Sequence, residues 1–94
     1  MTNELQCIYD TQKSFYGKAK VIKTTLDGTT IIELKSYSTI VARIIINGSQ
    51  TKYIYNGYYS RTTARHQKEF FLQYGLDTKQ YDKLKKQQEL IINE

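Results

Sequence analysis

Side chains that could bind or transform a ligand gather in residues 58–66 of the sequence. This stretch begins a predicted helix, where unpaired backbone N–H groups and the positive end of the helix dipole attract anions. A helix start usually carries an acidic side chain, yet none occurs before Glu69, and two arginines stand there instead. Hydroxyl groups, free N–H groups and guanidinium groups together favour a phosphate or carboxylate ligand. We therefore expect a site for an anion or a partner protein at Tyr58, Tyr59, Ser60, Arg61, Thr62, Thr63, Arg65 and His66.

A structural interpretation of the same stretch stands beside the functional one. Tyr58 and Tyr59 have rings that could stack on a base or cover a ligand. Ser60 is also simply a good N-cap, and Arg65 is spaced to pair with Glu69 one turn further along the helix. Both interpretations fit the sequence.

Helical spacing separates the cations of this stretch from its histidine. Arg61, Arg65 and Lys68 share one outward side of the predicted helix, away from the apolar stripe. His66 lies at the edge of that stripe, near Phe70. We therefore expect a hydrogen-bonded structural histidine rather than a catalytic one.

Signatures of self-sufficient catalysis are missing from the sequence. His66 is the only histidine, so no HExxH or HxH pattern exists, and no GxSxG, Walker or GxGxxG motif occurs. The only cysteine, Cys7, excludes an intrachain disulfide and a cysteine-rich zinc site. Asp10, Asp27 and Asp77 fall at predicted turn or cap positions, where aspartate has a structural role. We expect no catalytic residue, no metal and no cofactor.

One enzymatic alternative is a small ribonuclease that works without metal. In such an enzyme, cationic side chains stabilise the charge that develops on the phosphate, while histidine or tyrosine transfers the proton. Arg61, Arg65 and His66, with the neighbouring tyrosines, provide these residue types in one segment. The composition permits this activity without indicating it.

The composition predicts one small domain that favours anionic partners. The chain has 94 residues and a low hydrophobic fraction of 39%, but 13% aromatic residues, including nine tyrosines, argue against disorder. A net charge of +5 favours nucleic acid, nucleotides or acidic protein surfaces, although scattered lysines also suit a solvated surface. No apolar stretch is long enough to span a membrane and no signal peptide is recognisable, so we expect the cytoplasm of the host cell.

Three dipeptides that tolerate positive φ angles divide the first two-thirds of the chain: Asp27-Gly28, Asn47-Gly48 and Asn56-Gly57. Each favours a tight reversal between strands. The predicted strands are residues 18–26, 29–35, 38–46 and 50–55, and the third is central because it is apolar on both faces apart from Arg43. Residues 5–9 add a further strand at an edge, in which Cys7 is a buried thiol.

The apolar period changes to a helical one after residue 60. Residues 61–74 form a helix with Ser60 as N-cap and Gly75 at its end. Asp77 and Gln80 form a capping box for a second helix, whose apolar side runs through Ile92. We expect an α+β fold: a four- or five-stranded antiparallel β-meander, then two helices, the first packed on the sheet. Residues 1–76 form the sheet and capped helix, and residues 77–94 form a lysine-rich helix of the same domain.

Three segments of the sequence resemble a family of small uncharacterised domains from Gram-positive bacteria, their phages and plasmids. The segments are residues 13–19 (KSFYGKA), 34–42 (LKSYSTIVA) and 59–70 (YSRTTARHQKEF). The resemblance covers roughly residues 8–76 and implies an apolar residue where Gln67 stands. It brings no established activity, but it implies a mobile-element setting, in which small basic proteins are often counter-defence factors.

These observations together favour a non-catalytic binding protein of phage or mobile-element origin. It would act as a counter-defence inhibitor that occupies a host defence protein or sequesters an anionic nucleotide. A nucleic-acid-binding accessory protein and the metal-free ribonuclease are the alternatives. Exposed sheet edges and the tyrosines also leave room for a homo-oligomer.

Overall fold

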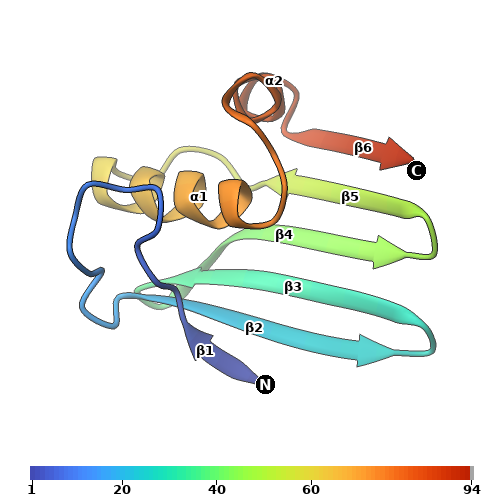
Figure 1. Cartoon of the computed structure of the whole chain (residues 1–94), viewed down its shortest axis with the longest axis horizontal. Helices are drawn as coiled ribbons and strands as arrows, with labels where there is room; N and C mark the ends of the chain where they lie inside the picture. The colour runs from blue at the N-terminus through green and yellow to red at the C-terminus, as the bar shows by residue number, and fades with distance from the viewer. Residues whose placement is uncertain (94) are drawn as a thin grey trace.

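The computed structural model describes residues 1–93 and confirms an α+β fold (Figure 1). One antiparallel sheet is covered by two helices on one face. Neither helix within residues 1–93 is long and apolar enough to cross a membrane. The elements are β1 (Thr2–Glu4), β2 (Ala19–Leu26), β3 (Thr29–Ser36), β4 (Thr39–Asn47), β5 (Gln50–Tyr55), α1 (Arg61–Gln73), α2 (Thr78–Gln87) and β6 (Glu89–Asn93).

The strands lie in the sheet in the same order as in the sequence, β1-β2-β3-β4-β5-β6. The sheet therefore has six strands within the described residues, rather than the predicted four or five. The additional strand is β6, which follows both helices and pairs antiparallel with β5. Figure 1 shows β6 returning along β5 after the chain has passed through α1 and α2.

Two of the three predicted hairpin turns are confirmed. Asp27 (φ 50°) and Gly28 (φ 78°) join β2 to β3, and both positive angles match the twist of the flanking strands. Gly48 (φ 61°) lies in the two-residue connection between β4 and β5. The prediction for Asn56-Gly57 is wrong, because this pair connects β5 to α1: the Asn56 side chain donates to the Ile40 carbonyl instead of closing a hairpin.

β4 lies inside the sheet, between β3 and β5, as its apolar character predicts. A register shift opposite Leu34 and Lys35 inserts one extra residue, Val41, into β4. Both Val41 and Ala42 are consequently buried, although strict alternation places them on opposite faces. The irregularity also turns the Val41 carbonyl toward Asn56, whose backbone N–H donates to it.

The predicted edge strand at residues 5–9 is wrong in its position. The edge strand is β1, and a long loop follows it from Leu5 to Lys18. Leu5 is buried, but Tyr9 is 60% exposed, so the alternation that suggested a strand does not correspond to one buried face. Cys7 accordingly lies in this loop, half-buried, and not in a strand.

α1 begins and ends where its capping residues predict. The Ser60 hydroxyl accepts a hydrogen bond from the backbone N–H of Thr63 at 3.1 Å, and Gly75 has a φ of 103° directly after the C-cap residue. Phe70 and Phe71 are fully buried and pack edge to face, with ring centroids 5.3 Å apart. These aromatic side chains hold α1 on the sheet over β3 and β4.

α2 also begins as predicted but is shorter. Asp77 and Gln80 form the capping box, and Tyr81 and Leu84 are buried. The helix ends at Gln87 because Gln88 adopts a left-handed conformation (φ 65°), and the chain then enters β6. The predicted helix through Ile92 is therefore wrong; Glu94, its predicted last residue, lies outside the described residues.

The core lies between the helices and one face of the sheet. It contains β-strand residues such as Ile32, Leu34 and Ile44 on one side and helix residues such as Phe70 and Leu84 on the other. Gln67 is fully buried among them, where the family resemblance implied an apolar residue. Its amide donates to the carbonyl of Val41, as a second donor beside the Asn56 N–H, and to the carbonyl of Gly57 in the β5–α1 connection.

A buried carboxylate fixes the loop between β1 and β2 against α1. Glu69 is 1% exposed and accepts hydrogen bonds from three consecutive backbone N–H groups, those of Ile8 (3.1 Å), Tyr9 (2.9 Å) and Asp10 (2.8 Å). Gln73 donates to the same carboxylate from one turn further along α1. Hydrogen bonds from N–H groups to a charged acceptor are stronger than neutral ones, so these contacts compensate for the burial of the charge.

We expect Glu69→Gln to lower the free energy of unfolding by about 2–4 kcal/mol, because an amide offers one acceptor oxygen and carries no charge. Urea unfolding followed by circular dichroism measures this difference. Lys68→Gln is the matched control at the neighbouring exposed position and should change stability by less than about 0.5 kcal/mol. A Glu69→Gln variant as stable as the wild type would show that the loop does not depend on this carboxylate.

Candidate functional site

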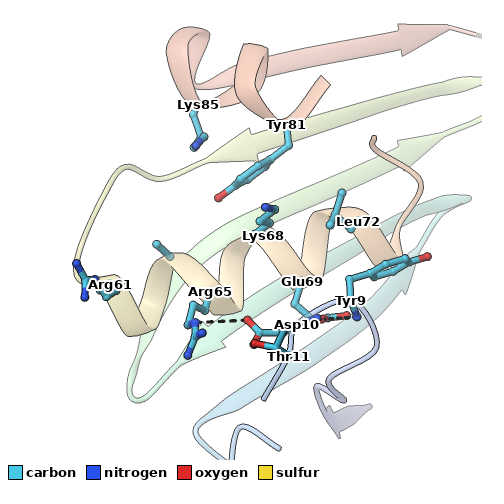
Figure 2. Close-up of a pocket in the computed structure, with 11 residues that line it drawn as sticks. Tyr9, Asp10, Thr11, Arg61, Arg65, Lys68, Glu69, Leu72, Tyr81 and Lys85 are labelled. Atoms are coloured by element: carbon cyan, nitrogen blue, oxygen red, sulfur yellow. Dashed lines mark hydrogen bonds and ion pairs between the residues drawn. The ribbon is translucent and has the colours of Figure 1, made fainter. Parts of the chain in front are cut away.

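A groove runs along the outer side of α1 (Figure 2). Its volume is about 420 Å³. α1 forms its floor, α2 stands on one side, and the loop around Asp10 lies on the other. The lining residues are Tyr9, Asp10, Thr11, Arg61, Ala64, Arg65, Lys68, Glu69, Leu72, Tyr81 and Lys85.

The groove concentrates positive charge. Arg61, Arg65 and Lys68 lie along α1 at intervals of about one turn, as their spacing predicts, and Lys85 faces them from α2. The Glu69 carboxylate, one of the two acidic groups in the lining, is already occupied by the three backbone N–H groups. The four cations of the lining outnumber its two carboxylates, so the groove has a net positive charge.

The ion pairs of the groove differ from the structural interpretation of the sequence. Arg65 does not pair with Glu69; its Nε lies 3.6 Å from Oδ2 of Asp10. This contact forms because the bonds from Glu69 to the loop place Asp10 beside α1. Arg61 and Lys68 make no ion pair with any residue in the described range 1–93.

α2 contributes an aromatic hydroxyl and a cation to the groove. Lys85 Nζ lies 4.8 Å from the centroid of the Tyr81 ring, within the range of a cation–π contact, and 3.5 Å from Oδ1 of Asp82. Burial raises the pKa of Tyr81, so its hydroxyl stays protonated and can donate a hydrogen bond. Figure 2 shows this hydroxyl directed toward α1.

The eight site residues expected from the sequence divide into three groups in the structure. Arg61 and Arg65 line the groove. Thr63 and His66 are buried on the sheet side of α1, away from the cations. Ser60 is the N-cap, and the remaining residues are exposed at the helix start but do not line the groove: Tyr58, Tyr59 and Thr62.

His66 belongs to a buried polar network. Its Nδ1 lies 2.7 Å from the Ser36 hydroxyl, which in turn lies 2.9 Å from the Thr63 hydroxyl. The ring of Phe15 packs against the imidazole edge to face, with centroids 4.6 Å apart. Burial lowers the pKa of His66, an effect that the negative charge of Asp10 partly opposes, so the folded chain holds a neutral imidazole.

The thiol of Cys7 lies near the same loop. Its partial burial, followed by the negative charges of Asp10 and Glu69, raises its pKa above the usual value, while Arg65 opposes the shift. The thiolate is therefore disfavoured, and the side chain is a poor nucleophile. Among residues 1–93, no group of three or more histidine, cysteine, aspartate or glutamate side chains could hold a metal ion.

Sequence reasoning identified the floor of the groove and missed its sides. The outward side of α1 followed from helical spacing, including Lys68. Tyr9, Asp10 and Thr11 lie about 60 positions away in the sequence, and long-range contacts, chiefly those of Glu69, bring them to α1. The available signal was the absence of any acid before Glu69, which hinted that this carboxylate has a special role.

The fold defines a small α+β domain with a six-stranded sheet in chain order and a cationic groove between its helices. A model of a family of unknown function (DUF8033) matches residues 3–88, and the chain belongs to this family. This confirms the resemblance to small domains without an established activity and extends it from residues 8–76 across α2. No curated protein and no solved structure gives a match.

The lowered pKa of His66 makes the stability of the fold depend on pH. The unfolded chain binds a proton near the ordinary pKa of 6.5, whereas the folded chain does so only at lower pH. The free energy of unfolding therefore decreases as the pH falls from 6.5 through the lower pKa of the folded state, and this group adds no further change below it.

We expect His66→Asn, which keeps a polar group near Ser36 but does not titrate, to lose less stability than the wild type between about pH 7.5 and about pH 5. Urea unfolding at both pH values measures the difference. The exposed Thr62→Ala variant should keep the pH dependence of the wild type. An unchanged pH dependence in His66→Asn would assign the effect to other groups.

Proposed function

We propose that this protein is a non-catalytic binding protein that holds a phosphorylated anion, a nucleotide, in the groove between α1 and α2. The observation that carries the proposal is the set of cations from two helices, Arg61, Arg65, Lys68 and Lys85, around one cavity. Arginine forks and lysine ammonium groups match phosphate oxygens in charge and in hydrogen-bonding capacity.

The size and lining of the groove support a small ligand. Its volume of about 420 Å³ lies within the range of about 300–1,000 Å³ that is usual for small-molecule sites. Tyr9 and Leu72 provide apolar surface beside the cations, and the Tyr81 hydroxyl provides a neutral donor. A phosphate with an attached base and sugar uses all three kinds of surface.

The Asp10–Arg65 pair gives the groove a means of accepting a ligand. The contact is 3.6 Å long, and the Arg65 side chain is 43% exposed, so the pair is weak. A phosphate that approaches Arg65 replaces one monovalent carboxylate with a more strongly charged partner. Asp10 stays in place because its backbone N–H is bound to Glu69.

The family resemblance implies a mobile-element setting, in which small basic proteins are often counter-defence factors. Binding a nucleotide without converting it fits that role. A small protein that sequesters a nucleotide deprives a host defence protein of that ligand and returns it unaltered when released. The only histidine is a buried neutral imidazole outside the groove lining, which supports binding over ribonuclease chemistry. The inhibitor could also act by binding directly to a host defence protein instead of to its nucleotide.

We expect Arg61→Ala and Lys68→Ala each to weaken nucleotide binding by about tenfold to a hundredfold, since each removes a charge-assisted contact. Isothermal titration with a panel of linear and cyclic nucleotides measures the affinity, and chromatography of the released ligand checks that it is unaltered. Lys79→Ala on α2, outside the groove lining, is the matched control and should bind as the wild type does. Equal binding by all variants, no binding of any nucleotide, or a cleaved ligand contradicts the proposal.

A nucleic-acid-binding function is the second candidate, and a specific observation favours it. Tyr58 and Tyr59 are 70% and 48% exposed at the end of α1 that carries Arg61. Exposed aromatic rings beside a row of cations are the features with which proteins hold single strands.

We expect this second function to appear as affinity for a single-stranded oligonucleotide that falls steeply with salt concentration, because each neutralised phosphate releases a counterion. Fluorescence anisotropy at several salt concentrations measures it. Tyr58→Ala should weaken such binding, whereas Tyr16→Ala, at an equally exposed tyrosine outside this helix end, should not. Nucleotide binding with no oligonucleotide affinity decides against this candidate.

A further inference from the structure

The face of the sheet opposite the helices is not covered in the single chain. On β3, for example, Ile32 and Leu34 are buried under α1, while Ile31 and Glu33 point to the other side. The same alternation continues across the register of the neighbouring strands. We call this surface the open face and define it by its apolar side chains Ile22, Ile31, Ile45, Ile54 and Ile91.

We infer that the open face binds a second copy of this chain. Its five isoleucines come from five successive strands, β2 to β6, and Ile31 and Ile45 are direct cross-strand neighbours. Ile91 is 46% exposed, and the other four are partly exposed. Charged side chains of the same face stand between the others: Glu33 and Arg43 lie between Ile22 and Ile54, and Lys52 lies between Ile45 and Ile91. Exposed apolar side chains gathered on one face and bordered by polar ones are typical of an interaction site.

The charges of the open face select a partner of similar, nearly neutral character. Arg43 Nε lies 3.0 Å from Oε2 of Glu33, and Lys52 Nζ lies 3.2 Å from Oε1 of Glu89. Glu4 stands opposite Lys20, which in turn stands opposite Lys35, so the charged side chains of the face have both signs with a small positive excess. The chain as a whole has a net charge of +5, so this face repels a second copy less than the rest of the surface does.

The dimensions of the open face suit a dimer. Strands about 4.8 Å apart, with a rise of about 3.3 Å per residue, give six strands of this length a face of about 600 Å². Two such faces bury about 1,200 Å², which is at the lower end of stable interfaces. Stacked sheets lie about 10 Å apart with nearly aligned strands, and a two-fold axis brings the same patch together on both copies.

The test is the mass of the full chain by sedimentation equilibrium, from about 1 µM to about 1 mM. We expect the wild type to reach twice the mass of the chain and Ile45→Lys to remain monomeric, because a buried unpaired ammonium is costly. Ile45→Thr keeps the branched strand side chain and should raise the dimer dissociation constant by about tenfold. If Ile45→Lys fails to fold, Ile45→Thr still tests the inference.

Ile8→Lys and Ile8→Thr are the matched controls, because Ile8 is 66% exposed but lies in the β1–β2 loop. These variants, and the groove variant Arg61→Ala, should dimerise like the wild type. Circular dichroism establishes that each variant is folded. The inference is overturned by a wild type that stays monomeric throughout, or by folded Ile45 variants that dimerise as tightly as the wild type.

Discussion

The carboxylate of Glu69 is the contact on which the functional side of the molecule depends. It lies buried on α1 and binds three backbone N–H groups of a loop that is about 60 positions away in the sequence. A buried charge of this kind is stable only while all its partners are in place. The position of the loop, and with it one side of the groove, therefore depends on this side chain, together with the hydrogen bond from Gln73 to the Gln6 carbonyl.

This constraint also explains the electrostatics of α1. Glu69 is the first acidic residue of the helix, but its carboxylate binds the backbone of the loop, so Arg61 and Lys68 have no ion pair in residues 1–93. The loop supplies Asp10 for Arg65 alone. A helix whose sequence is only moderately basic thus presents a strongly cationic outer surface.

Local signals in the sequence predicted most of the fold. Asp27-Gly28 and the Ser60 cap act over a few residues, and the structure confirms both. Predictions failed where contacts between distant segments determine the structure. Asn56-Gly57 has the residue types of a hairpin turn, but the helix α1 follows it instead of a strand. Ile91 and Ile92 fit a helical side as well as a strand, and the free edge of β5 selects the strand. In the groove, the α1 floor was predictable from helical spacing, whereas the side formed by the loop was not.

The order of the strands has a consequence for the way the chain acquires its structure. Each of the first five strands pairs with its neighbour in the sequence, so these pairings can form as the chain emerges during synthesis. The last strand and the Glu69 contacts join distant segments and close only when the final third of the chain is present. Until then β5 is an unpaired sheet edge, and α2 has no strand to anchor its far end. In the nascent protein, the first five strands thus come together first, and the groove beside α1 is completed last.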